Sequence, residues 1–247
     1  MRIAVFSDMH GNDVAFEAVE ADIQKQKVDQ LVCLGDAIQG GPQPAAVTQR
    51  LFRLGCPVVM GNADAWMLSG VETADEGIPR ERLKKMGEIR LWSLSQLTEE
   101  ERNFISRFQP TVTIPLEENL KLLCFHGSPV SFDDAILPAA PQEEFRKHLG
   151  AYAEHILTGG HTHAQQIRRN GELFFFNPGS VGFVYSHDQP DDQFHTDAWA
   201  EYAILKAENG QTSLEFRRIP YDVNELIRVY RESGRPYAEE AIAQYQR

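Results

Sequence analysis

Short apolar runs alternate with amphipathic segments along the first part of the chain. The apolar runs at 3–6, 30–34 and 57–60 predict strands. Between them, apolar residues recur at spacings of three and four, which predicts helices over 16–23 and 47–54. Such an alternation of strands and helices favours right-handed βαβ units and a parallel sheet.

The rest of the chain adds a helical region and several strands. Residues 65–108 have a helical pattern, which includes a capping box formed by Thr98 and Glu101. A closing helix is expected over 222–233. Because the sequence contains no repeat or linker, we expect one domain over residues 1–247, with a helical insertion at about 65–108. The later strands and hairpins are predicted at 111–114, 120–125, 155–158, 167–176 and on both sides of 208–210.

Charge and composition narrow the possible partners. The formal net charge is −12, and the basic residues form isolated pairs, whereas sequence-independent binding of nucleic acid requires a basic surface. No apolar run approaches the roughly 20 residues of a membrane span, and the N-terminus does not resemble a signal peptide. Cys33, Cys56 and Cys124 are odd in number and unrelated in spacing, which favours buried free thiols. We therefore expect a cytoplasmic protein that binds neither nucleic acid stably nor membranes; oligomer formation stays open.

Five short polar motifs stand out, most of them directly behind a predicted strand. Ligands of α/β sheets bind at the carboxyl ends of the strands, so loops that leave different strands converge there. Oxygen and imidazole donors without thiolates suit Mn, Fe, Zn, Ni or Co. One such motif alone would mean little, but five in this order indicate a metal site. The candidate ligands are Asp8, His10, Asp36, Asn62, His126, His161 and His163.

The spacing within the motifs suggests how the side chains are presented. In Asp8-x-His10 and His161-x-His163, an extended backbone would direct both side chains to the same side, because strand side chains alternate with period two. Glycines beside the other ligands allow close approach of the backbone to an ion. The remaining four histidines fit no such pattern and are expected to be surface or packing residues: His148, His155, His187 and His195.

The motifs resemble the five signature motifs of the calcineurin-like metallophosphoesterases, in particular of small bacterial and archaeal members of phosphodiesterase type. The similarity runs from Arg2 to about Gly182 and includes Asn177-Pro178-Gly179-Ser180. The fold it implies is an α/β four-layer αββα sandwich, in which two mixed β-sheets are flanked by helices. The motifs that carry the resemblance are Asp8-x-His10, Gly35-Asp36, Gly61-Asn62-x-Asp64, His126-Gly127 and Gly160-His161-x-His163.

The resemblance implies two divalent transition-metal ions, with manganese favoured. Asp36 would bridge them together with a water or hydroxide that acts as nucleophile. Asn12 would contact the substrate phosphate, although the residues allow a helix N-cap equally well. Asp64 would orient a ligating histidine or cap a helix. Catalytic roles are thus expected for Asp36, Asn62, His126 and Asn12. One ion would be held by Asp8, His10, Asp36 and His163, and the other by Asp36, Asn62, His126 and His161.

One position departs from the family pattern. Many members have a histidine directly after the motif asparagine, thought to protonate the leaving group, and this chain has Ala63. The sequence therefore favours a binuclear-metal-dependent hydrolase of phosphodiesters or phosphoanhydrides, with nucleotides among the candidate substrates. The alternatives are a phosphomonoesterase and a non-catalytic scaffold of the same fold that binds protein partners. The segment 129–141, which follows the ligand His126, is expected to lie over the site.

Overall fold

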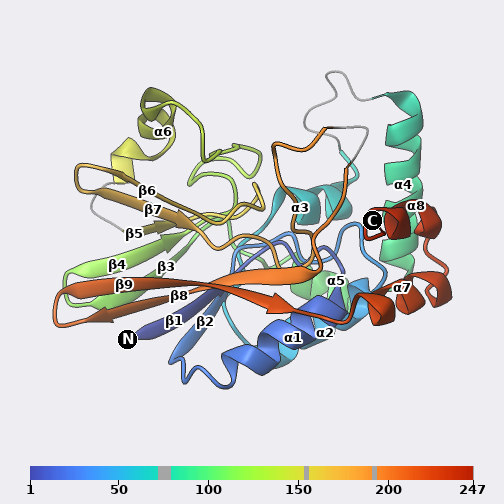
Figure 1. The fold of residues 1–247 in the computed structure, drawn as a ribbon, viewed down its shortest axis with the longest axis horizontal. Helices are drawn as coiled ribbons and strands as arrows, with labels where there is room; N and C mark the ends of the chain where they lie inside the picture. Colours follow the sequence, from blue (N-terminus) through green and yellow to red (C-terminus); the bar gives the residue numbers. More distant parts are fainter. Residues whose placement is uncertain (72–78, 153–155, 191–193, 247) are drawn as a thin grey trace.

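Two mixed β-sheets pack face to face between outer helices (Figure 1). The computed structural model describes residues 1–71, 79–152, 156–190 and 194–246. One sheet has the strand order β2-β1-β8-β9, and the other has the order β3-β4-β5-β7-β6. This arrangement confirms the four-layer sandwich that the sequence analysis expected.

The strands of each sheet run in both directions. β1 pairs parallel with β2 and antiparallel with β8, while β4, β5 and β7 run parallel and the hairpins antiparallel. The first sheet consists of β1 (Arg2–Phe6), β2 (Gln30–Cys33), β8 (Trp199–Glu208) and β9 (Gln211–Pro220). The second consists of β3 (Val112–Glu117), β4 (Leu120–Cys124), β5 (Ile156–Thr158), β6 (Gln166–Asn170) and β7 (Leu173–Asn177).

The helices form the outer layers and one end of the molecule (Figure 1). Those of the first half are α1 (Asp13–Ile23), α2 (Pro44–Leu54), α3 (Asn62–Ser69), α4 (Arg80–Ser95) and α5 (Glu99–Ile105). Those of the second half are α6 (Gln142–Leu149), the 3₁₀ turn Gly150–Tyr152, α7 (Val223–Glu232) and α8 (Ala238–Ala243). None of the helices in the described residues is long and apolar enough to cross a membrane.

β1 shows how the apolar pattern builds the layers. Ile3 and Val5 are fully buried in the core between the two sheets, where Leu122 of β4 also lies. Ala4 and Phe6 point to the other face and pack in the core beneath α1. Because full burial of a large apolar side chain is worth about 1.5–3 kcal/mol, both faces of this strand contribute to stability.

Two of the predicted segments differ in detail. Residues 57–60 form no ladder strand: Val58 makes an isolated bridge to Cys33, and Val59 makes one to Gln109. The segment alternates between a partner on each side and then turns into α3, so neither pairing extends. The pattern over 65–108 resolves into α3, α4 and α5, with the capping box at Thr98 as predicted, while residues 72–78 lie outside the described part.

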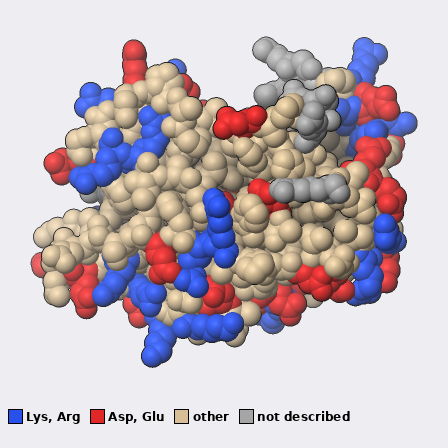
Figure 2. Space-filling view, in the orientation of Figure 1, with Lys and Arg blue, Asp and Glu red and all other residues tan. Residues whose placement is uncertain are grey.

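Surface charge is mixed. On the face that Figure 2 shows, lysine and arginine side chains are interspersed with aspartate and glutamate. At the α4 end, Lys85 Nζ contacts Glu240 of α8 at 2.8 Å, and the Tyr237 hydroxyl donates to Glu88 at 2.6 Å. These contacts join α4 to the C-terminal helices.

Candidate metal centre

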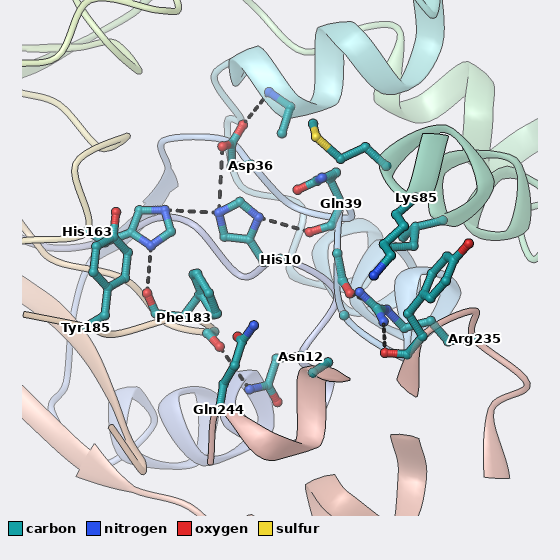
Figure 3. Close-up of a pocket in the computed structure, with 18 of the residues that line it drawn as sticks. His10, Asn12, Asp36, Gln39, Lys85, His163, Phe183, Tyr185, Arg235 and Gln244 are labelled. Atoms are coloured by element: carbon teal, nitrogen blue, oxygen red, sulfur yellow. Dashed lines mark hydrogen bonds and ion pairs between the residues drawn. The ribbon is translucent and has the colours of Figure 1, made fainter. Parts of the chain in front are cut away.

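The loops that leave both sheets meet at one end of a cavity of about 690 Å³ (Figure 3). The amide of Asp8 donates to the Gly35 carbonyl at 2.9 Å, which ties the loop after β1 to the loop after β2. The amide of His161, after β5, donates to Asp8 Oδ2 at 3.2 Å. The amide of Gly160 donates to the His126 carbonyl at 2.9 Å, so the loop after β4 joins the same cluster. The seven candidate ligands are thereby brought together.

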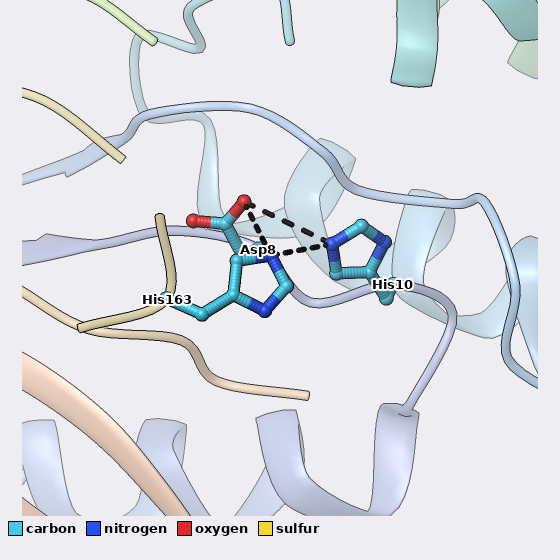
Figure 4. A group of neighbouring side chains, drawn as sticks. All are labelled: Asp8, His10 and His163. Atoms are coloured by element: carbon cyan, nitrogen blue, oxygen red, sulfur yellow. Dashed lines mark hydrogen bonds and ion pairs between the residues drawn. The ribbon is translucent and has the colours of Figure 1, made fainter. Parts of the chain in front are cut away.

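Asp8, His10 and His163 form the first group of side chains (Figure 4). The Nε2 atoms of the two histidines lie 3.0 Å apart, and Asp8 Oδ1 lies 3.3 Å from His163 Nε2 and 3.8 Å from His10 Nε2. Asp8 and His163 are buried, and Asp8 Oδ1 has no hydrogen-bond partner. Three donor atoms therefore face one small space.

The partners of the ring nitrogens show that these atoms suit a cation. His10 Nδ1 donates to the Gln39 carbonyl at 2.9 Å, and His163 Nδ1 donates to the Phe183 carbonyl at 2.6 Å. With Nδ1 protonated, both Nε2 atoms present lone pairs to each other. Metal–nitrogen bonds of about 2.1 Å place neighbouring ligand atoms roughly 3 to 3.5 Å apart. The first group therefore fits a bound metal ion.

Asp36, His126 and His161 form the second group, and Asn62 lies among them. Asn62 Oδ1 is 3.0 Å from His126 Nε2 and 3.1 Å from His161 Nδ1. His126 Nδ1 donates to the Leu34 carbonyl at 2.8 Å, which leaves its Nε2 for the site. His161 instead turns its Nδ1 inward. The amide oxygen and both nitrogens converge as ligands of one ion would.

Asp36 lies between the two groups. Its Oδ2 is 3.7 Å from His10 Nε2 of the first group and 3.4 Å from His126 Nε2 of the second. Its Oδ1 accepts a hydrogen bond from the Ala63 amide at 2.9 Å, which fixes the orientation of the carboxylate. This is the position that a bridging ligand requires.

The comparison with known families agrees with this geometry. The model of the calcineurin-like phosphoesterase superfamily domain matches residues 1–209. The chain belongs to this superfamily. Among curated proteins, it is 28% identical to the uncharacterized protein MJ0912 of Methanocaldococcus jannaschii, over 90% of this chain and 88% of that one. It is 27% identical to phosphodiesterase YfcE of Escherichia coli, over 73% of this chain and 79% of that one.

Solved structures show the same architecture. The crystal structure of a metallophosphoesterase from Sphaerobacter thermophilus superposes with a TM-score of 0.74 and 25% identity, and the match covers 99% of this chain and 98% of that chain. Hypothetical protein PH1004 from Pyrococcus horikoshii shares the fold with a TM-score of 0.80 at 21% identity, over 98% and 96% of the chains. The fold of this calcineurin-like phosphoesterase thus extends over nearly its whole length.

Charges within the site stabilise one another. Burial opposes ionisation of Asp36, but His126 and His10 hold the pKa of this carboxyl well below its usual range. Burial likewise opposes the charged form of His126, yet Asp36 raises the pKa of His126 to about 10. Since only the neutral imidazole is a metal ligand, an ion that binds His126 has to displace a proton.

The backbone of the ligand motifs is not extended, so that expectation is wrong. φ is 57° at Asp8, 46° at His10, 66° at His161 and 54° at His163, and Asp36 has φ 52°. The motifs lie beyond the strand ends, where hydrogen bonds between loops, rather than a sheet ladder, set the conformation. Non-glycine residues in this left-handed region cost about 1–3 kcal/mol each, and such strain is concentrated at functional sites.

Asn12 and Asp64 both accept hydrogen bonds from backbone amides. Asn12 Oδ1 accepts from the Ala15 amide at 3.0 Å, so Asn12 is the N-cap of α1, and its side chain also lines the cavity. A contact between Asn12 and substrate phosphate stays a prediction. Asp64 is buried and accepts from the Ala37 amide at 2.9 Å, whereas the N-cap of α3 is Gly61. Asp64 therefore supports the backbone next to Asp36 rather than a histidine ring.

The segment Asn177-Pro178-Gly179-Ser180 makes hydrogen bonds to the loops that carry the candidate ligands. Asn177 Nδ2 donates to the Gly160 carbonyl at 2.6 Å and to Thr162 Oγ1 at 3.1 Å. Ser180 Oγ donates to the Asp8 carbonyl at 2.8 Å. The motif itself was visible in the sequence, but its positioning role was not.

Three of the other histidines lie in the described residues. His187 Nε2 donates to the Thr162 carbonyl at 2.6 Å, between the two ligands of the last motif. His148 Nδ1 pairs with Asp134 at 3.0 Å, and the His195 amide donates to Gln189. His187 is thus closer to the site than the sequence indicated. His155 lies outside the described residues.

Proposed function

We propose that this calcineurin-like phosphoesterase is a binuclear-metal-dependent hydrolase of phosphodiesters or phosphoanhydrides, with nucleotides among its substrates. The observation that carries the proposal is the position of Asp36, whose Oδ2 faces His10 and His126 at 3.7 and 3.4 Å. A carboxylate shared by two donor groups suits two ions rather than one. The similarity to phosphodiesterase YfcE supports the preference for diesters.

The ions, the ligand side chains and the backbone carbonyls would have different roles in such a site. Two divalent ions, manganese foremost, would lower the pKa of a bound water and neutralise the phosphoryl oxygens. Gln39, Leu34 and Phe183 supply the carbonyls that orient three histidine rings. The proposed ligands of one ion are Asp8, His10, Asp36 and His163, and those of the other are Asp36, Asn62, His126 and His161.

Ala63 indicates which leaving groups the site would favour. This residue lines the cavity beside Asp36 but has no side-chain donor, so it cannot protonate a departing alkoxide. Esters of good leaving groups and anhydrides need no such proton. General acid catalysis typically contributes about 10²–10⁴ in rate, which is the disadvantage expected for alkyl monoesters.

The test is an assay of the purified protein loaded with manganese. Bis(p-nitrophenyl) phosphate and dinucleoside polyphosphates should be hydrolysed faster than alkyl phosphomonoesters, and metal analysis should give two ions per chain. Asp36→Asn should lower the occupancy of both sites, while Asp29→Asn, at an exposed position, serves as the control. Full metal content without hydrolysis of any substrate would instead favour the non-catalytic scaffold.

A further inference from the structure

The cavity extends well beyond the candidate metal ligands. Its far end is walled by α4 and by the C-terminal segment that contains α7 and α8. Figure 3 shows Lys85 and Arg235 at this end and Asp36 and His163 at the other. Volumes of about 300–1,000 Å³ hold ligands of drug or nucleotide size, so the 690 Å³ cavity has room for far more than one phosphoryl group.

The far end is basic, although the chain is acidic overall. Arg82, Lys85 and Arg235 line it, and Glu240 is the acidic residue that the described part of the chain places at that end. Lys85 is paired with Glu240 at 2.8 and 2.9 Å, and this pair is partly solvent-exposed. Arg82 is exposed and makes no ion pair with a described residue. Among the described residues, no carboxylate forms an ion pair with Arg82 or with Arg235.

Arg235 is held in place by neutral groups. Its Nε donates to the Gly40 carbonyl at 2.5 Å, and its Nη1 donates to the carbonyls of Pro236 at 2.8 Å and Tyr237 at 3.2 Å. The guanidinium lies over the Tyr230 ring, 5.5 Å from its centroid. None of these contacts neutralises the charge, and no described carboxylate forms an ion pair with it. A fixed, half-buried guanidinium with an unused edge is well suited to bind an anion.

Apolar side chains line the cavity as well. Trp66 of α3 and Met86 and Ile89 of α4 line the cavity, and the Tyr237 ring lies beneath Lys85 Nζ at 5.1 Å. An apolar or aromatic group can pack here without losing hydrogen bonds. The cavity thus combines the candidate metal ligands, apolar side chains and a cationic end in one space.

We propose that the far end, at Arg235 and Arg82, binds a second anionic group of the substrate, separated from the scissile phosphoryl group by an apolar or aromatic body. This inference rests on the proposed function, because it assigns the other end to the metal centre. The preferred substrates are then molecules with two anionic groups, a phosphoester at one end and a phosphate or carboxylate at the other.

Inhibitors with two anionic ends provide the test. We would measure how α,ω-alkanebisphosphonates of increasing chain length inhibit hydrolysis of bis(p-nitrophenyl) phosphate, with alkylphosphonates of equal length as controls. At one optimal length, the bisphosphonate should bind about tenfold or more tightly than its control, as a charge-assisted contact implies. ω-Carboxyalkylphosphonates of the same lengths distinguish a carboxylate from a phosphate as the favoured second group.

Variants link the effect to the proposed residues. Arg235→Gln should abolish the advantage at the optimal length. Arg82→Gln, at an exposed position where folding is not at risk, should reduce it several-fold while leaving the inhibition by alkylphosphonates unchanged. Lys84→Gln, on the same helix but outside the cavity, is the matched control.

Two results would overturn the inference: affinities that do not depend on chain length, or an optimum that persists in both arginine variants. If the protein hydrolyses no diester, the proposed function fails. Calorimetric titration of the manganese-loaded protein with the same bisphosphonates then still decides whether the cationic end binds.

Discussion

The amide of Ala63 donates a hydrogen bond to Asp36 Oδ1 at 2.9 Å, so the residue without a side-chain donor lies directly beside the carboxylate between the two ligand groups. Ala63 also lines the cavity. A larger side chain at this position would therefore reach the space in which a substrate reacts.

Ala63→His should narrow the gap between aryl and alkyl esters, because an imidazole at this position can protonate the leaving oxygen. We expect kcat/KM for alkyl phosphomonoesters to rise by about tenfold or more, with little change for bis(p-nitrophenyl) phosphate. Rates for leaving groups of graded pKa measure the effect. Ala65→His, two residues further along α3, is the control. A wild-type rate that is independent of leaving-group pKa would show that protonation is already supplied.

Gly61→Ala should distort the candidate metal centre. A Cβ atom at Gly61 would lie 2.0 Å from Asp36 Oδ1 and 2.4 Å from Asp36 N, so the carboxylate has to move. Overpacking of this kind costs about 1–3 kcal/mol, and displacement of a supporting contact typically lowers metal affinity by about 10–100-fold. Metal titration and thermal melting would show both effects. Gly150→Ala, whose Cβ meets nothing within 4 Å, should change neither.

Asp22→Asn should reduce stability in a pH-dependent manner. Burial opposes its ionisation, but hydrogen bonds from Arg217 and Tyr202 lower the pKa of Asp22 below its usual value. Stability from this group is present above the unfolded-state pKa of about 3.8 and is lost as pH falls through the folded-state value. The variant should lose about 1–2 kcal/mol at pH 7 and show a much smaller loss in strong acid. Urea unfolding at both pH values measures the difference, and an equal loss at both would contradict the assignment.

Asp133→Asn should favour anionic substrates. Asp133 belongs to the segment 129–141 and lines the cavity, so the variant removes one negative charge from the cavity wall. We expect kcat/KM for dinucleoside polyphosphates to rise about two- to fivefold, less at high salt, because screening weakens the repulsion. Metal content should stay the same. If the kinetics are unchanged on every substrate, this segment only connects β4 to α6.

Much of the fold can be predicted from the sequence, because the spacing of apolar residues shows which face of a strand or helix is buried. The alternation in β1, with Ile3 and Val5 on one face and Ala4 and Phe6 on the other, matches the two cores on either side of the strand. Residues 57–60 are predicted as a strand but form only isolated bridges, because an apolar run shows burial and not how many neighbours the backbone pairs with. The family motifs supplied the layer order, which periodicity alone does not encode.

The sequence predicts the candidate side chains of the site but not its backbone groups. The candidate ligands stood out by residue type, whereas the carbonyls of Gln39 and Phe183 carry no signal, since any residue offers one. The left-handed backbone at Asp8 was also hidden, because loop pairing imposes it. The sequence does not indicate the cationic end, because Arg82 of α4 and Arg235 of the C-terminal segment line one cavity only in the folded chain.

The position of Arg235 also limits what can be inferred about function from relatives. The superfamily match ends at residue 209, yet Tyr230, Arg235 and Tyr237 form part of the cavity wall. The candidate metal ligands and the proposed binding end for a second anionic group thus come from separate stretches of the chain. Under this proposal, substitutions after residue 209 would alter the choice of substrate and leave every candidate ligand unchanged. A comparison limited to the matched domain therefore gives no information on the proposed site at Arg235.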